Sequence, residues 1–165
     1  DLTVSPALSS GLRFITLWEV LTIDLGDEPQ KKIPLFKGLS HRQARIAALF
    51  GRIEAYAPGD RIIEQGQEGQ EMCILIEGIV TAKVKRDDND LSLQQIRPGD
   101  IFGEVALFTR ERMAHIDAEE YVRVLWLNQE SLERIQTRYP KIAAQMFWNL
   151  TGTVAERLVQ TTERL

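Results

Sequence analysis

The sequence predicts a mainly β domain, a sandwich or barrel of short strands with helices on both sides of it in the chain. Three observations lead to this prediction. Between Arg52 and Asn128, turn signals recur roughly every 8–12 residues, the spacing of short antiparallel strands. Alternating or continuous apolar segments lie between these turns. Beyond Asn128 the apolar residues recur every three to four positions, which is the period of an amphipathic helix.

Composition narrows the possible functions. The chain has 165 residues, of which 44% are hydrophobic and 27% charged, so it can form a core. Its net charge of −4 gives no general attraction to nucleic acid or anionic lipid. A single cysteine, Cys73, excludes an internal disulfide, and two histidines, His41 and His115, argue against a histidine metal centre. We therefore expect no metal site. The lone thiol and the lack of a secretory signal favour a cytoplasmic location.

Residues 1–32 are predicted to form an N-terminal appendage. Ser9 and Ser10 can cap a helix over 12–25, and Gly26 to Pro29 follow as a linker. The apolar face of this helix is wide and requires a partner, which could be the rest of the chain, a second copy in a homodimer, or a membrane surface. Because the chain begins with Asp1 rather than methionine, we expect it to be a piece of a longer protein.

The remaining residues, 33–165, are predicted to form one domain. Ser40 is a plausible N-cap for a short helix that ends at Gly51. The acidic run 87–90 is interpreted as an exposed hairpin tip, since it lacks the glycine and distal glutamate of a calcium loop. Two helices are expected within 129–165, separated at Pro140. The expected strands are 61–64, 72–76, 80–84, 91–96 and 121–127.

The residues best suited to bind a ligand lie between Ile101 and Ile116. Gly103 permits a tight turn, and the four residues from Glu104 to Leu107 are typical of one helical turn, whose unpaired N–H groups attract anions. Arg112 can return a guanidinium to the same place for bidentate contact with oxygen atoms. Glu104 adds an acceptor. This combination suits a ligand that carries both a hydroxyl and a phosphate.

Two signatures in this region are similar to those of a known family. The first is Phe102-Gly103-Glu104-Val105-Ala106-Leu107 followed by Arg112-Met113-Ala114-His115-Ile116, and the second, earlier one includes Ile62-Ile63, Gly66-Gln67, Gly69, Met72 to Leu75 and Gly78. They resemble the cyclic nucleotide-binding domains of the catabolite activator protein and of the regulatory subunits of cyclic AMP-dependent protein kinase. The resemblance covers about residues 33–165.

The resemblance implies an eight-stranded jelly roll over about 52–128, with N-terminal helices and two C-terminal helices at 129–165. It also implies that the ligand is cyclic AMP or cyclic GMP. Glu104 would accept the ribose 2′-hydroxyl, Arg112 would hold the cyclic phosphate, and the long helix after Pro140 would act as a lid or relay. The implied binding residues are Gly103, Glu104, Val105, Ala106, Leu107, Arg112, Met113 and Ala114.

Two departures from the family pattern affect this assignment. The loop between Leu107 and Arg112 is shorter than is usual in the family, so Arg110 is an alternative phosphate ligand. Arg112 is favoured because it brings Ala114 and Ile116 into register with the next strand. Met113 stands where a small or hydroxylated residue is usual, and the missing hydroxyl favours cyclic AMP over cyclic GMP.

The sequence contains no recognisable nucleophile–base–acid set, so a regulatory binding domain is predicted rather than an enzyme, with no cofactor. Such domains report to a larger protein. Residues 2–8, Leu-Thr-Val-Ser-Pro-Ala-Leu, look like the end of the last membrane helix of resistance-nodulation-division-type exporters, which would make this chain a transporter tail. Two alternatives stay open. One is a degenerate module that dimerises and binds no nucleotide. The other is the sensory part of a transcription regulator, although no nucleic-acid contact is expected from this fragment.

Overall fold

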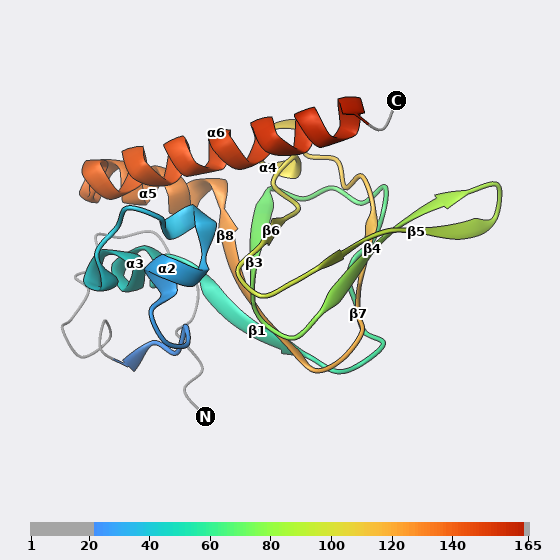
Figure 1. Ribbon diagram of the computed structural model, residues 1–165, viewed down its shortest axis with the longest axis horizontal. Helices are drawn as coiled ribbons and strands as arrows, with labels where there is room; N and C mark the ends of the chain where they lie inside the picture. Colours follow the sequence, from blue (N-terminus) through green and yellow to red (C-terminus); the bar gives the residue numbers. More distant parts are fainter. Residues whose placement is uncertain (1–21, 164–165) are drawn as a thin grey trace.

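The protein folds as a jelly roll of eight strands in two four-stranded antiparallel sheets. The computed structural model describes residues 22–163. One sheet has the order β1-β8-β3-β6 and the other the order β2-β7-β4-β5, as Figure 1 shows. The prediction of a mainly β, eight-stranded jelly roll with flanking helices is therefore confirmed. The strands are β1 Arg52–Tyr56, β2 Arg61–Ile63, β3 Glu71–Glu77, β4 Val80–Arg86, β5 Asn89–Ile96, β6 Ile101–Phe102, β7 His115–Ala118 and β8 Val122–Asn128.

Helices lie at one end of the barrel and along its upper edge (Figure 1). Helix α3 starts with a capping box, in which the Ser40 hydroxyl accepts from Gln43 N and the Gln43 side chain accepts from Ser40 N. It ends at Ala48, three residues before the predicted stop at Gly51. The helices are α2 Pro29–Lys32, the 3₁₀ helix η1 Pro34–Phe36, α3 His41–Ala48, α4 Ala106–Thr109, α5 Gln129–Arg138 and α6 Pro140–Glu163.

Strands β3 and β8 are apolar at nearly every position because both of their faces are covered. Met72 and Ile74 of β3 belong to a hydrophobic cluster shared with the helices, whereas Cys73 belongs to a second cluster inside the barrel. The alternation of side chains along a strand produces this division. The two strands pair directly, with Cys73 opposite Trp126. They form the wall between the helices and the barrel interior.

The N-terminal segment enters the same core. Ile23 and Leu25 are buried with the helical cluster, while Asp24 between them is exposed and pairs with Arg123. Residues 23–25 lie outside any helix or strand, so the predicted helix over 12–25 is wrong for its last three residues. Thr22 is helical, as predicted, and the part of that helix up to residue 21 lies outside the described residues. The domain division at residue 32 stays a prediction.

Helix α6 is held differently in its two halves. Ile142, Ala143, Met146 and Leu150 are buried in the first half. The Asn149 side chain donates to the carbonyl oxygens of Leu35 and Lys37, at 2.8 and 2.7 Å. From 151 to 163 no residue is buried. The first half is thus part of the core, and the second half lies on the surface.

The hairpin of β4 and β5 projects from the barrel (Figure 1). Asp87 and Asp88 at its tip are exposed and adopt positive φ angles, as expected for a tight turn. The predicted hairpin tip is therefore found where the acidic run lies. Within residues 22–163, none of the helices has both the length and the apolar character that crossing a bilayer requires.

Candidate functional site

The segment from β6 to β7 presents the predicted site residues. Strand β6 pairs with β3, Phe102 lying opposite Cys73. Gly103 follows with φ +71°, a left-handed conformation that glycine adopts without strain. The chain then forms helix α4, which ends at Arg110 with φ +63°. Two left-handed residues therefore bracket one short helical turn, and the sequence anticipated only the first of them.

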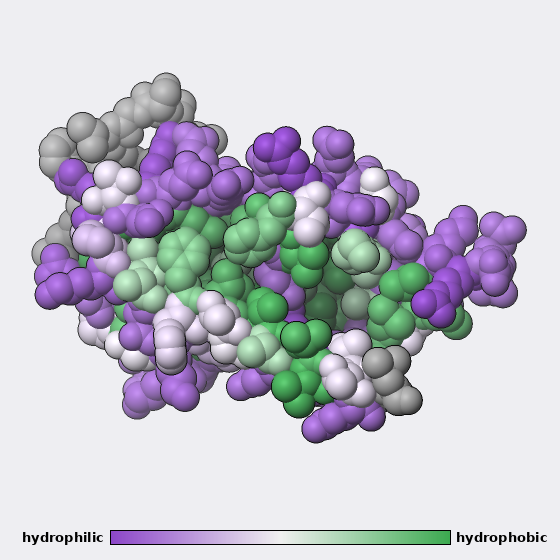
Figure 2. All heavy atoms as spheres, turned by 90° about the horizontal axis from the view of Figure 1, so that it is seen from above, coloured by the Kyte–Doolittle hydropathy of each residue, from purple (hydrophilic) through white to green (hydrophobic). Residues whose placement is uncertain are grey.

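A cavity of about 200 Å³ opens beside this turn. Its walls come from β2, β4, β5, β6, β7 and α4, with a contribution from α6. Seven of the eight predicted site residues line this cavity, and Leu107 does not. The seven are Gly103, Glu104, Val105, Ala106, Arg112, Met113 and Ala114. The Leu107 side chain instead packs into the helical cluster, because it points back toward the body of the protein. Figure 2 looks down on α6 and shows apolar side chains in the middle of this face and polar ones at its rim.

Arg112 is fixed in the wall of the cavity. Only 7% of the residue is exposed, and its Nη1 donates to the carbonyl oxygens of Glu71 at 2.7 Å and Gly103 at 3.2 Å. Its backbone is held as well, since its N–H donates to Gln67 O at 3.0 Å. These bonds satisfy part of a guanidinium that presents five donors in a fixed fork. The remaining donors can serve a ligand.

Gly69 and Gly103 make the room that Arg112 occupies. A Cβ at Gly69 would lie 2.5 Å from Arg112 Nε, and one at Gly103 would lie 2.8 Å from Arg112 Nη1. Both distances are shorter than a Cβ can tolerate. Gly69 carries no positive φ, so its lack of a side chain is required by this close approach rather than by the backbone. The sequence pattern contained Gly69, but its steric role became visible only in the structure.

Arg110 lies on the other side of its loop. It lines a separate depression together with Glu68 and Gln70. With the Gln70 amide oxygen turned toward it, that oxygen accepts from Arg110 Nε at 2.8 Å and from Nη2 at 3.1 Å. The short loop is also anchored by its backbone, since Gly69 N donates to Arg110 O at 2.9 Å. Of the two candidate phosphate ligands, only Arg112 faces the cavity.

The N–H groups of α4 are engaged within their own turn. Ala106 N donates to Gly103 O at 3.3 Å, and Leu107 N donates to Glu104 O at 3.2 Å. Both bonds span three residues, as in a 3₁₀ turn, and both are long. Both N–H groups are therefore paired in this arrangement, and their part in an anion site stays a prediction. An anion at this place would have to replace weak local bonds.

Glu104 has a partner that the sequence analysis did not identify. Its side chain is 10% exposed, and its Oε1 forms an ion pair with Nη1 of Arg157 from helix α6. Nη2 of the same arginine donates to Ile101 O, and Arg157 lines the cavity. No sequence pattern could have indicated this pair, since its members are 53 residues apart and only their positions in space bring them together.

The remaining nucleophilic and titratable candidates have structural roles. Cys73 is fully buried, and burial raises the pKa of its thiol well above the usual value. The thiol is thus kept neutral and unreactive. His115, at the start of β7, is buried, and its Nδ1 accepts from Gln65 N at 3.0 Å. Among residues 22–163, no cluster of three metal-ligating side chains occurs.

Comparison with known proteins identifies the family. A family model described as "Cyclic nucleotide-binding domain" matches residues 53–139, which is more than half of the chain. The chain therefore belongs to the cyclic nucleotide-binding domain family. The cavity, Glu104 and Arg112 lie within the matched range.

Individual relatives agree with this result. The chain is similar to cyclic nucleotide-gated channel beta-3 of Canis lupus familiaris, with 28% identity over 76% of this chain and 16% of the channel subunit. It is similar to the cAMP-dependent protein kinase type II regulatory subunit of Drosophila melanogaster, with 31% identity over 66% of this chain and 29% of that subunit. Among solved structures, the catabolite activator protein of Thermus thermophilus superposes with a TM-score of 0.73 and 28% identity over 79% of this chain and 61% of that one. The chain thus spans less than a third of these two curated relatives.

Proposed function

We propose that this domain is a non-enzymatic regulatory module that binds a cyclic nucleotide, with cyclic AMP favoured, in the cavity beside α4. The observation that carries the proposal is the presence of a buried carboxylate, Glu104, and a buried guanidinium, Arg112, on the wall of one cavity. A ligand that has a hydroxyl next to an anionic phosphodiester matches this pair. The names of two relatives, a cyclic nucleotide-gated channel and a cAMP-dependent kinase subunit, support the same ligand class.

Each residue has a distinct role in the proposed complex. Arg112 holds the cyclic phosphate with the guanidinium donors that Glu71 and Gly103 do not occupy, and charge-assisted bonds of this kind are the strong ones. Glu104 accepts a ribose hydroxyl. Val105, Ala106, Met113 and Ala114 surround the ligand. Met113 offers the base no hydroxyl, which favours adenine over guanine, and it is 60% exposed at the rim of the cavity.

The proposed output passes through helix α6 to a larger protein. A ligand shifts a conformational equilibrium only by its difference in affinity for the two states. Helix α6 contacts the site through Arg157, so its position can depend on occupancy. A membrane transporter is a proposed parent protein because residues 2–8 look like the end of an exporter membrane helix. In that setting the domain would lie on the cytoplasmic side of the membrane.

Calorimetric titration of the full 165-residue chain tests the proposal. Cyclic AMP should bind with heat and saturate, cyclic GMP should bind more weakly, and linear 5′-AMP serves as the uncyclised control. Glu104→Gln should weaken the binding of cyclic AMP. If neither cyclic nucleotide produces heat or raises the melting temperature, the domain is not a nucleotide sensor.

A second candidate function rests on the outer side of α6. Trp148 is 77% exposed, Leu158 66% and Val159 55%, and exposed large apolar side chains are typical of a surface that a partner covers. A dimerisation module could use this side with or without nucleotide. Light scattering across a range of protein concentrations, with wild type and Trp148→Glu, measures that contact directly.

A further inference from the structure

Within the described part of the chain, one side chain makes the hydrogen bonds between the second half of α6 and the barrel. Among the described residues, the hydrogen bonds that join 151–163 to the barrel both come from Arg157, one to Glu104 and one to Ile101 O. The hydroxyls of Thr151, Thr161 and Thr162 bond only to carbonyls of their own helix. Gly152, at the start of this half, has open space around it. The first half cannot follow a movement of the second, because it is buried in the core.

Arg157 forms an ion pair with Glu104, the carboxylate proposed to bind the ligand. Glu104 is the buried carboxylate of the cavity, and one of its two oxygens is committed to Arg157. The ion pair lies at the cavity wall, and the guanidinium takes up space there. The cavity of about 200 Å³ is smaller than the roughly 300–1,000 Å³ that small-molecule sites usually have. A ribose hydroxyl would thus have to share the Glu104 carboxylate with Arg157, whose guanidinium also borders the volume that the ligand would fill.

We propose that Arg157 is a competing residue of the ligand site, which fastens residues 151–163 over the cavity and is displaced from Glu104 when the ligand binds. This inference rests on the proposed function and specifies its regulation. The moving part is the second half of α6, with the change in direction at Gly152. Pro140 is not the hinge, since the helix is anchored beyond it by Asn149 and Leu150.

The charges around the pair are consistent with an exchangeable contact. Arg112 is the second cation in the cavity wall, and it is bound to backbone carbonyls rather than to Glu104. Glu156, beside Arg157 on α6, and Asp100 border the adjoining groove. The Arg157 side chain is 34% exposed, so water can replace its bonds when it leaves. The Glu104 side chain, in contrast, is 10% exposed, so its carboxylate is stabilised by whichever hydrogen-bond donor remains beside it, from Arg157 or from the ligand.

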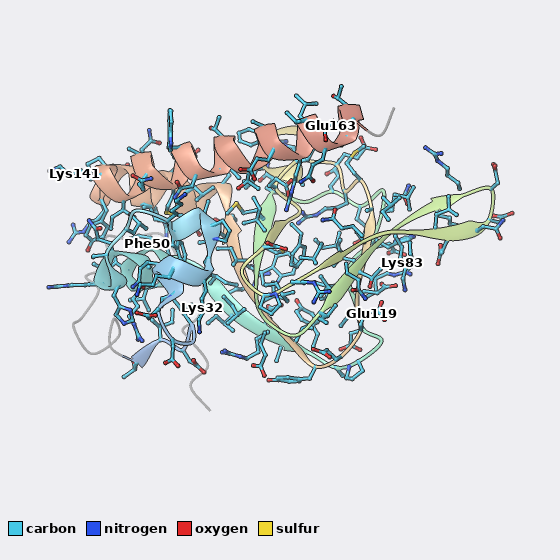
Figure 3. All side chains as sticks on the ribbon, viewed as in Figure 1. Lys32, Phe50, Lys83, Glu119, Lys141 and Glu163 are labelled. Atoms are coloured by element: carbon cyan, nitrogen blue, oxygen red, sulfur yellow. The ribbon has the colours of Figure 1, made fainter. Side chains whose placement is uncertain are left out.

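The experiment compares four versions of the 165-residue chain by calorimetry with cyclic AMP and by hydrogen exchange without it. They are wild type, Arg157→Ala, Arg157→Lys and the control Lys141→Ala, an exposed cation at the opposite end of α6 (Figure 3). Arg157→Ala should bind cyclic AMP about tenfold more tightly, because the ligand no longer displaces a charged hydrogen bond. Without ligand, its amides in 151–163 should exchange faster. Arg157→Lys should fall between alanine and wild type, and Lys141→Ala should match wild type.

A fourth variant separates the contact from the binding site. Glu104→Gln should also release 151–163 in the absence of ligand, although it weakens ligand binding. The two substitutions thus have the same effect on hydrogen exchange and opposite effects on affinity. If Arg157→Ala binds cyclic AMP as wild type does, or more weakly, the competition is refuted while the proposed function stands. If neither wild type nor Arg157→Ala binds, both are refuted. Unchanged exchange in Arg157→Ala and Glu104→Gln likewise refutes the fastening role.

Discussion

Gly69→Ala tests whether Arg112 is held for the ligand by the close approach of a backbone. The new methyl group would lie 2.5 Å from Nε, 2.6 Å from Nη2 and 2.7 Å from Cζ of Arg112. Ordinary contact begins at 3.4 Å, so the guanidinium must retreat by about 1 Å. Its bond to Glu71 O is 2.7 Å long, and at about 3.6 Å it would no longer be a hydrogen bond.

The expected cost falls on binding more than on folding. The atoms that clash belong to the end of a flexible side chain, so the backbone need not move, and the free energy of unfolding should fall by only about 1 kcal/mol. A guanidinium displaced by about 1 Å cannot keep a charged hydrogen bond to the phosphate, which is worth about 1.5–3 kcal/mol. The dissociation constant for cyclic AMP should therefore rise about 10- to 150-fold.

The measurement is a double-mutant cycle by calorimetry, with urea unfolding of the same samples. Gly69→Ala acts through Arg112, so adding it to Arg112→Ala should weaken binding no further. An additive double variant would show that Gly69 acts elsewhere. Wild-type affinity in Gly69→Ala would show that the guanidinium tolerates the displacement, and the steric argument would be wrong.

Three further predictions concern the phosphate ligand, α6 and the acid stability of the barrel. Arg112→Ala should weaken cyclic AMP binding by about 1.5–3 kcal/mol, and Arg110→Ala, whose side chain faces Gln70, should leave it nearly unchanged; calorimetry that gave the reverse order would reassign the phosphate. Gly152→Ala should raise the free energy of unfolding by up to about 1 kcal/mol, because the glycine lies within a helix with open space around it. If urea denaturation gave a lower free energy of unfolding for this variant, the new methyl group would be in an unfavourable contact. The hydrogen bond from Arg61, together with Lys83, lowers the pKa of Asp117, so this carboxylate stabilises the fold above pH 3.8 and that contribution is lost as the pH falls through the lowered pKa. Asp117→Asn should therefore cost about 1 kcal/mol at pH 7, with a deficit that disappears in acid, and a deficit independent of pH would refute this account.

Local signals in the sequence predicted five of the eight strands, β2, β3, β4, β5 and β8, whereas the eight-stranded jelly roll followed from the resemblance to a family. Pro58-Gly59 and Pro98-Gly99 mark the ends of strands, because the backbone preferences of proline and glycine favour a turn whatever the tertiary surroundings. Ser40 began a helix as predicted, because a capping box depends only on residues three apart. The errors arose where tertiary burial overrides local preference. Residues 23–25 look helical in the sequence but form no helix in the structure, where Ile23 and Leu25 are buried in the core.

The sequence predicted the parts of the site that lie close together along the chain, but not the contacts between distant segments. Glu104 and Arg112 are eight residues apart in one turn-and-loop segment, so their common placement follows from a short pattern. The contact with Arg157 depends on how the end of a 24-residue helix meets the barrel, which no residue pattern specifies. The steric demand on Gly69 was hidden for the same reason, since it comes from a side chain 43 positions away.

The two cavity arginines differ in a way that assigns them different work. Arg112 is 7% exposed, bonds to two backbone carbonyls and lies close to Gly69 and Gly103, so moving it would weaken or break these two bonds. Arg157 lies on a helical half that has no buried residue, and water can satisfy its donors. An anion therefore meets a fixed cation at Arg112, whereas a hydroxyl that approaches Glu104 meets a cation that can leave. Affinity should depend mainly on the first arginine, and the response of α6 on the second.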